Sequence, residues 1–374
     1  MSEFRNRVSA NELQEILRLQ LSTISKLPVS SRKLPPTMVW GAPGIGKSTI
    51  IRNLAKELGI GFIDVRLAQR EPVDIRGLPV PSEDGVKWLV SSEWPRDPNS
   101  KGIILFDEIT SADRSLQVAA YEFILDRRLG DLYTVPDGWY IVAAGNRIED
   151  RAVAMTMSSA LANRFLHVEL NEDAEEWGKW AVSSGIHPVV CSFIRFRPEL
   201  LFKSESEDLE RGWPTPRSWE RVSVMLKLAE QSGMKKSLAQ KLVYGLVGNG
   251  AGSEFMSFYR NSDIMEDVLS ALTDPSKEIS IPDSPDRKYA LVSAMVYYLW
   301  KAVDENDLNN RLTGFFKICM KLSNDFSAMA ISDAMASEGR LSKKVSEAKA
   351  SRILSHPLYK EWSKSHGKVL KKYL

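Results

Sequence analysis

The chain has 374 residues, a formal net charge of +2, 43% hydrophobic residues and 26% charged residues. Such a length predicts roughly two or three domains, and so small a net charge does not indicate the strongly basic surface of a dedicated nucleic-acid-binding protein. No apolar run reaches the roughly 18 residues of a membrane-spanning helix, and the amino terminus lacks the apolar segment of a secretion signal. We therefore expect a cytoplasmic protein without a membrane partner.

The two cysteines, Cys191 and Cys319, lie far apart in the sequence and outside any CxxC pattern. This spacing indicates neither a disulfide framework nor a zinc site. We expect both side chains to be thiols of the protein core.

In chain order, the sequence predicts a short helical segment, an α/β core and a long helical region. The helical segment covers residues 1–33. Within 34–170, β-branched runs alternate with helical patterns, which is typical of a parallel sheet covered by helices. Beyond residue 170 helical periodicity takes over, and a connection rich in proline and aspartate divides that region into 171–278 and 279–374. The expected strands of the core are 37–42, 61–67, 101–108, 138–145 and 165–170.

The stretch GAPGIGKST, between the first expected strand and a helix, matches the pattern G-x-x-x-x-G-K-[ST]. Small side chains let backbone N–H groups surround phosphate oxygens, and the helix N-terminus adds the positive end of its dipole. Lys47 is expected to reach the β- and γ-phosphates of a nucleotide, and the Ser48 hydroxyl to ligate Mg²⁺. The residues expected to hold the nucleotide are Gly41, Ala42, Pro43, Gly44, Ile45, Gly46, Lys47, Ser48 and Thr49.

The stretch GIILFDE ends a strongly apolar strand with two acids, Asp107 and Glu108. Such a run is typical of a central parallel strand buried on both faces, which carries the acids to the same sheet edge as the phosphate loop. Asp107 is then a candidate Mg²⁺ ligand, and Glu108 is the candidate base that activates an attacking water. A catalytic glutamate beside the metal-binding aspartate favours ATP hydrolysis over a simple nucleotide kinase.

Together with AAGNR, SALANRF and TPRSW, these motifs resemble those of the AAA+ ATPases, and among them the MoxR branch. The resemblance implies a P-loop AAA+ core with a central five-stranded parallel sheet at 34–170. It also implies an α-helical lid at 171–278 and a helical C-terminal extension at 279–374. The segment at about 71–95 resembles the helix-2 insert of that branch.

The resemblance implies roles for three further polar side chains, which join Lys47 and Glu108 in the expected catalytic set. Asn146 is the expected first sensor, which holds the attacking water, and a turn-forming asparagine is the alternative. Arg164 is the expected arginine finger for the nucleotide of a neighbouring subunit, and a surface salt bridge is the alternative. Arg217, after a proline at the start of a lid helix, resembles the second sensor.

The sequence therefore predicts an enzyme that binds ATP and Mg²⁺ and hydrolyses ATP. By the resemblance, it works as a homo-oligomeric ring, a hexamer in the family, and remodels or matures a partner protein in a chaperone-like manner. Such partners often carry a von Willebrand factor A domain. Two alternatives stay open at this stage: a DNA-directed AAA+ motor or loader, and a nucleotide-gated assembly scaffold with little turnover.

Two surface features bear on the choice of partner. The lysine-rich segment 343–374 leaves a nucleic-acid partner open, although a solvated helical face is the simpler interpretation. Trp88 and Trp94 in the insert are candidates for gripping a polypeptide, and packing against a neighbouring subunit is the alternative.

Overall fold

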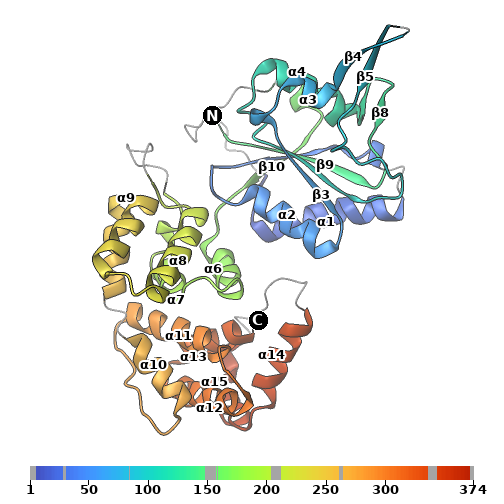
Figure 1. The fold of residues 1–374 in the computed structure, drawn as a ribbon. Helices are drawn as coiled ribbons and strands as arrows, with labels where there is room; N and C mark the ends of the chain where they lie inside the picture. The colour runs from blue at the N-terminus through green and yellow to red at the C-terminus, as the bar shows by residue number, and fades with distance from the viewer. Residues whose placement is uncertain are drawn as a thin grey trace. The chain divides into compact units, whose positions relative to one another are not determined.

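The computed structural model describes residues 6–27, 31–83, 85–147, 157, 159–203, 212–260, 264–335 and 343–370. The chain divides into two compact units, Met1–Glu172 and Asp173–Leu374, each with its own hydrophobic core (Figure 1). The ends of the predicted N-terminal segment and C-terminal extension, 1–5 and 371–374, lie outside the described residues. The division of the helical region near residue 278 stays a prediction.

The first unit is built on a six-stranded sheet in which all neighbouring strands are parallel. All five strands expected from the sequence are present. The sixth strand, absent from the sequence prediction, is two residues long and too short to leave a periodic pattern. In spatial order the strands are β1 (Arg7–Val8), β10 (Leu166–Leu170), β2 (Thr37–Trp40), β9 (Trp139–Gly145), β6 (Gly102–Asp107) and β3 (Gly61–Arg66).

Helices cover both faces of this sheet, with α1 (Ala10–Lys26) and α2 (Lys47–Leu58) on one face and α4 (Arg114–Asp126) on the other (Figure 1). Strand β6, which lies between β9 and β3, is therefore inaccessible on both faces, and its residues Ile103, Ile104, Leu105 and Phe106 have no exposed surface. Asp113 caps the N-terminus of α4 by accepting a hydrogen bond from the backbone N–H of Leu116. The remaining short elements of this part are η2 (Leu67–Gln69), β7 (Arg128–Leu129), β8 (Tyr133–Thr134) and α5 (Ser159–Ala162).

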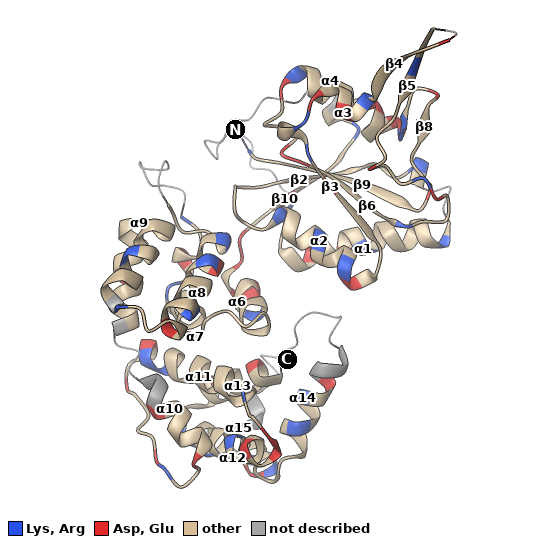
Figure 2. Ribbon diagram, in the orientation of Figure 1, with Lys and Arg blue, Asp and Glu red and all other residues tan. Residues whose placement is uncertain are grey.

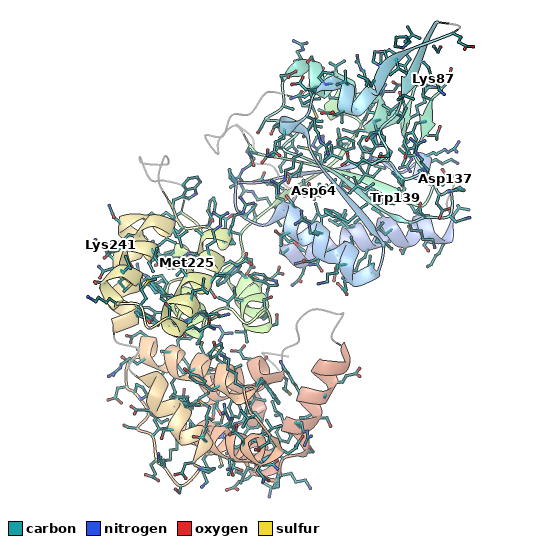
Figure 3. The ribbon with its side chains drawn as sticks, in the orientation of Figure 1. Asp64, Lys87, Asp137, Trp139, Met225 and Lys241 are labelled. Atoms are coloured by element: carbon teal, nitrogen blue, oxygen red, sulfur yellow. The ribbon has the colours of Figure 1, made fainter. Side chains whose placement is uncertain are left out.

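The predicted insert forms a short helix, α3 (Pro72–Arg76), and an antiparallel hairpin of β4 (Leu78–Ser82) and β5 (Gly85–Leu89). Every described residue of β5 is exposed, and Trp88 retains 43% of its accessible surface. Lys87 lies on the same strand (Figure 3). Trp94 is 1% exposed because it packs against Phe106 and Phe123. Of the two candidate gripping residues, only Trp88 is at the surface.

The second unit is helical in its described residues and has one continuous core, which extends from Trp177 to Trp362. An ion pair between Arg195 and Asp333 lies inside it, with a 2.8 Å bond from Arg195 Nη2 to Asp333 Oδ1. Acidic and basic residues are interspersed along the helices of each unit (Figure 2). The elements are α6 (Ala174–Ser183), α7 (Pro188–Phe196), η4 (Pro198–Leu200), α8 (Pro216–Gln231), α9 (Lys236–Arg260), α10 (Ile264–Thr273), α11 (Pro285–Leu299), α12 (Glu305–Lys321), α13 (Asn324–Met335), α14 (Lys343–Ser355) and α15 (Pro357–Leu370).

Among the helices of the described residues, none combines the length and the apolar character needed to span a lipid bilayer.

Candidate functional site

The strand order places three predicted motifs side by side at the carboxyl edge of the sheet. β9 lies between β2 and β6 and pairs with both. The phosphate loop follows β2, the two acids end β6, and Asn146 follows β9. Parallel strands all end at the same edge, where ligands of open α/β sheets bind. Asn146 is therefore held between the phosphate loop and the acidic pair.

The glycines of the loop have backbone conformations that other residues rarely adopt. Gly44 and Gly46 have φ values of 84° and 103°, and Gly46 is the residue that precedes α2. A Cβ atom on Gly41 would lie 2.5 Å from Ile45 Cδ1 and 3.1 Å from the Leu170 carbonyl oxygen. The loop backbone thus curls tightly into the N-terminus of a 12-residue helix, which favours an anion such as a phosphate.

Lys47 connects the loop to Asn146. The lysine is 8% exposed, and its Nζ donates hydrogen bonds to the carbonyl oxygens of Gly41 at 2.6 Å and Ala42 at 3.1 Å. The same ammonium donates to Asn146 Oδ1 at 2.9 Å. The three donors of the ammonium therefore all have acceptors, which offset the cost of burying its charge.

Ser48 and Asp107 are in direct contact, since the Ser48 hydroxyl donates a hydrogen bond to Asp107 Oδ2. The other carboxylate oxygen of Asp107 accepts a hydrogen bond from the backbone N–H of Glu108 at 2.9 Å. A hydroxyl and a carboxylate are hard oxygen ligands of the kind that Mg²⁺ takes alongside nucleotide phosphates. In the described residues there is no cluster of three or more His, Cys, Asp or Glu residues that could hold a metal by itself. This donor set suits a metal that arrives with a nucleotide.

Glu108 occupies a strained position. Its φ of 57° lies in the left-handed region, which it shares with Arg127 alone among the described non-glycine residues. Such strain costs about 1–3 kcal/mol and clusters at functional sites. The side chain is half-buried, and within the described part of the chain its carboxylate is tied to no cation or hydrogen-bond donor. The carboxylate is thus placed at the sheet edge with its basic oxygens available.

Thr110, which the sequence analysis missed, links the turn after Glu108 to Asn146. Its Oγ1 accepts a hydrogen bond from the backbone N–H of Asn146 at 3.1 Å and lies 3.4 Å from the carbonyl oxygen of the same residue. Thr110 is 2% exposed. The sequence did show a threonine two positions after the acidic pair. Its hydrogen-bond partner, Asn146, could not be predicted from the local pattern because the contact depends on the order of the strands in the sheet.

Arg147 and the two predicted arginines, Arg164 and Arg217, occupy different surroundings. Arg147 donates to Glu169 Oε1 at 2.6 Å, so it is held by an ion pair beside Asn146. Arg164 is exposed in the turn between α5 and β10. Arg217 is exposed in the first turn of α8. Because Arg217 belongs to the second unit, its role at the nucleotide stays a prediction.

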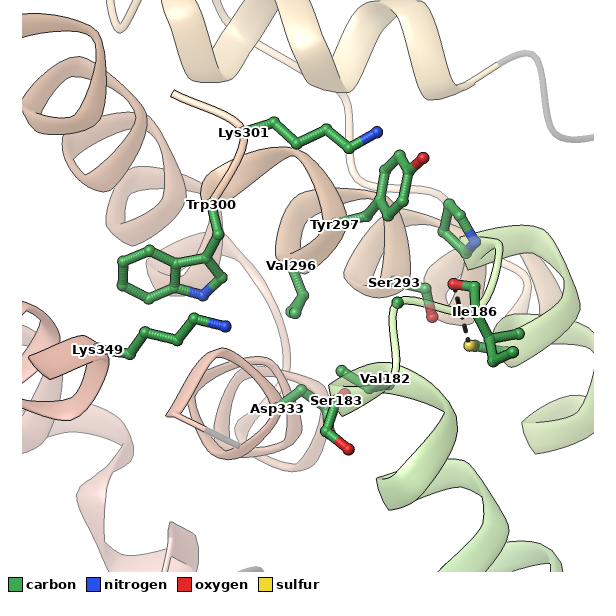
Figure 4. A pocket seen from close by; sticks show the side chains of 13 residues that line it. Val182, Ser183, Ile186, Ser293, Val296, Tyr297, Trp300, Lys301, Asp333 and Lys349 are labelled. Carbon is green, nitrogen blue, oxygen red and sulfur yellow. Dashed lines mark hydrogen bonds between the residues drawn. The ribbon is translucent and has the colours of Figure 1, made fainter. Parts of the chain in front are cut away.

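A separate cavity of about 160 Å³ lies within the second unit (Figure 4). Its rim carries Lys301, whose Nζ lies 3.7 Å from the centre of the Tyr297 ring. Inside it, the Cys191 thiol donates to the Ile186 carbonyl oxygen, and burial raises the pKa of this thiol to about 12. None of the residues predicted for nucleotide binding lines this cavity. Both cysteines are buried and unbridged, as the sequence predicted.

Comparison with known proteins agrees with this geometry. Residues 36–165 match the family described as AAA domain (dynein-related subfamily). Midasin of Giardia intestinalis is 23% identical over 261 residues, which are 67% of this chain but 5% of midasin. The chain therefore spans a small part of this curated relative.

Two solved structures are similar over most of the chain. A putative ATPase from Cytophaga hutchinsonii is 14% identical over 81% of each chain, with a TM-score of 0.31. A mutant of RuvB from Thermotoga maritima is 14% identical over 80% of this chain and 86% of its own, with a TM-score of 0.37. Both scores are below 0.5, so the assignment rests on the matched domain and on the observed strand order.

The matched region begins just before β2 and ends just before β10, and it contains the phosphate loop, the acidic pair and Asn146. Residues 36–165 therefore match an AAA domain, and the first unit has the P-loop AAA+ fold, for which nucleotide binding is the expected property.

Proposed function

We propose that this protein binds ATP with Mg²⁺ and hydrolyses it in an oligomeric ring to remodel a partner protein, in the manner of the MoxR branch of AAA+ ATPases. The observation that carries the proposal is the pair of contacts at the sheet edge. Lys47 reaches Asn146, and Ser48 reaches Asp107, so residues from three strand ends converge on one point. Such convergence is required for phosphoryl transfer, which depends on positioning and electrostatics.

In the proposed site, the backbone N–H groups of residues 41–49 other than Pro43 would hold the phosphates, with Lys47 at the β- and γ-phosphates. Ser48 and Asp107 would hold Mg²⁺, which would supply positive charge to balance the phosphates. Glu108 accepts the proton of the attacking water, because its carboxylate is not engaged by a cation in the described chain. Asn146 orients that water through its side-chain amide, and the bond from Lys47 to Asn146 Oδ1 supports this placement.

The proposed ring follows from Arg164. This exposed arginine precedes β10, and Leu166 pairs with Thr37 at the start of β2, so Arg164 lies towards the amino edge of the sheet. The phosphate loop follows the opposite end of β2. We assign Arg164 to the nucleotide of the neighbouring subunit, where a planar, permanently charged donor stabilises charge on the γ-phosphate. Arg217 is assigned to the second sensor, which couples the lid helices to the nucleotide.

The remodelling role is supported by the exposed hairpin of the insert, where Trp88 presents an aromatic side chain to solvent. A partner with a von Willebrand factor A domain is part of the proposal by resemblance to the MoxR branch.

We expect ATP and Mg²⁺ to convert the Glu108→Gln variant from a small species to a ring-sized one. The ring would have a mass near that of six copies of the 42.1 kDa chain. Analytical ultracentrifugation with and without nucleotide measures this mass, and blocked turnover keeps the complex loaded. Lys47→Met is the control, because it lacks the phosphate-binding ammonium and should stay in the small species. If Glu108→Gln had the mass of a single chain both with and without nucleotide, the proposed ring would be refuted.

We expect Thr110→Val to lower kcat about fivefold to tenfold, because the buried Asn146 N–H loses its acceptor and the amide loses its position. KM for ATP should change by less than about twofold, since the phosphate loop is untouched. Thr110→Ser is the matched control, since it keeps the hydroxyl and should retain most of the activity. Steady-state kinetics at several ATP concentrations separates kcat from KM. Equal losses in the Val and Ser variants would refute a role for the hydroxyl.

A further inference from the structure

Strand β10 carries a histidine whose contacts join two parts of the proposed catalytic machinery. His167 lies beside Trp40 with nearly parallel ring planes; the ring centres are 6.0 Å apart and the interplanar angle is 14°. Trp40 is the last residue of β2, directly before Gly41 of the phosphate loop. The Trp40 indole N–H donates to His167 Nδ1 at 2.8 Å. The histidine is thus fixed to the strand that leads into the phosphate loop of its own subunit.

The second ring nitrogen of His167 points to the turn that carries Arg164. His167 Nε2 lies 2.7 Å from the carbonyl oxygen of Ala162, the last residue of α5. The same carbonyl accepts the backbone N–H of Phe165 at 3.3 Å and so closes the turn that contains Arg164. An indole N–H can only donate and a carbonyl can only accept. The hydrogen of the neutral imidazole is therefore on Nε2, and both bonds are made by one tautomer.

A continuous set of contacts follows from these bonds. Lys47 donates to the Gly41 carbonyl, Gly41 follows Trp40, Trp40 donates to His167, and His167 donates to Ala162 at the start of the Arg164 turn. Glu169, two residues further along β10, holds Arg147 next to Asn146. Strand β10 thus contacts both β2, which leads into the phosphate loop, and Arg147, which follows Asn146. The same strand begins directly after the Arg164 turn.

We propose that His167 is a positioning residue that ties the Arg164 turn to the phosphate-loop strand of the same subunit. Each subunit supplies Arg164 to the active site of its neighbour. The phosphate-loop strand of the supplying subunit then holds this arginine in place. This inference rests on the proposed role of Arg164 in the neighbouring active site. His167 itself touches neither substrate nor metal in this arrangement and acts through the turn.

The test places the same substitution on either side of a subunit interface. Glu108→Gln subunits lack the base but offer Arg164, whereas Arg164→Ala subunits keep the base but offer no arginine. In a mixture, turnover arises where a Glu108→Gln subunit supplies its arginine to an Arg164→Ala subunit. His167→Gln is added either to the Glu108→Gln chain or to the Arg164→Ala chain, and kcat and KM of the mixture are measured.

We expect His167→Gln on the arginine-supplying chain to lower kcat of the mixture about tenfold, with KM for ATP unchanged within about twofold. The same substitution on the other chain should leave kcat within about twofold. Glutamine keeps an N–H near the position of Nε2 and loses the acceptor for Trp40, whereas His167→Asn keeps an acceptor near Nδ1 and loses the donor to Ala162. Both variants should give the same asymmetry, because the contact requires both bonds.

His366→Gln is the matched control. The ring plane of His366 is also nearly parallel to that of a tryptophan, Trp362, and His366 Nε2 lies 3.3 Å from the carbonyl oxygen of Leu322, but His366 belongs to the helical unit. It should leave the mixture unchanged on either chain. Equal losses from His167→Gln on both chains, or no loss on either, would overturn the positioning role. If the mixture without any His167 change shows no turnover, the neighbour-directed role of Arg164 fails, and this inference fails with it.

Discussion

Replacing Glu108 with glutamine is expected to lower ATP turnover by roughly 100-fold to 10,000-fold while leaving ATP binding intact, because a general base contributes about that factor. Glutamine has nearly the same shape as glutamate but cannot accept a proton from water. The contacts that hold the phosphates and the metal, Lys47 with the loop carbonyls and Ser48 with Asp107, do not involve the Glu108 side chain. Binding and hydrolysis should therefore separate in this variant.

The measurement combines phosphate release at saturating ATP with the affinity for a fluorescent ATP analogue. Glu122→Gln is the matched control, since Glu122 is an acid on α4 that pairs with Arg128 at 3.6 Å, away from the sheet edge. It should keep its turnover. If Glu108→Gln hydrolysed ATP as fast as the unaltered protein, Glu108 would not be the general base. Loss of analogue binding in Glu108→Gln would instead give Glu108 a part in holding the nucleotide.

The sequence predicted the strands and motifs of the first unit because their signals are local. The run from Ile103 to Phe106 is apolar at every position, and a strand with no exposed face has this pattern. The loop from Gly41 to Ser48 is recognisable because its glycines fill backbone positions that other residues avoid. Neither conclusion needs knowledge of which strands are neighbours.

The interior arrangement of the site could not be predicted in this way. Nothing in the local pattern of β9 says that it lies between β2 and β6, because buried parallel strands have similar compositions. The contact of Lys47 with Asn146 spans 99 positions in the sequence, and that of Trp40 with His167 spans 127. The left-handed conformation of Glu108 was also unforeseen, since glutamate has no special preference for it.

The two tryptophans of the insert show the same limit. Trp88 and Trp94 are similar in sequence terms, each lying in a stretch that mixes polar and apolar residues. Trp94 is buried because the aromatic rings of β6 and α4 reach it, whereas the described residues of the strand that bears Trp88 are all exposed. Whether each tryptophan is buried or exposed therefore depends on tertiary contacts, which the local sequence pattern does not contain.

Arg164→Ala is expected to lower ATP turnover by about 1,000-fold or more, as removal of an arginine finger does in other nucleotide hydrolases. Arg164 is exposed, and in the described residues no ion pair links it to an acid. The substitution should therefore leave the fold and the nucleotide affinity unchanged, which thermal unfolding and analogue binding can check. Arg128→Ala is the control, because Arg128 is another exposed arginine whose pairing with Glu122 lies outside the proposed site; its turnover should be retained.

Mixing Arg164→Ala with Glu108→Gln decides where the arginine acts. In a ring of head-to-tail contacts, random equal mixing gives about a quarter of all sites both a base and a neighbour's arginine, so up to about a quarter of full turnover should return. The recovered activity should peak at equal mixing and fall towards zero as either variant dominates. An arginine that serves its own nucleotide would give no recovery at any ratio, because no subunit would then contain both groups. The shape of this mixing curve therefore separates the two assignments, even if the recovery is incomplete.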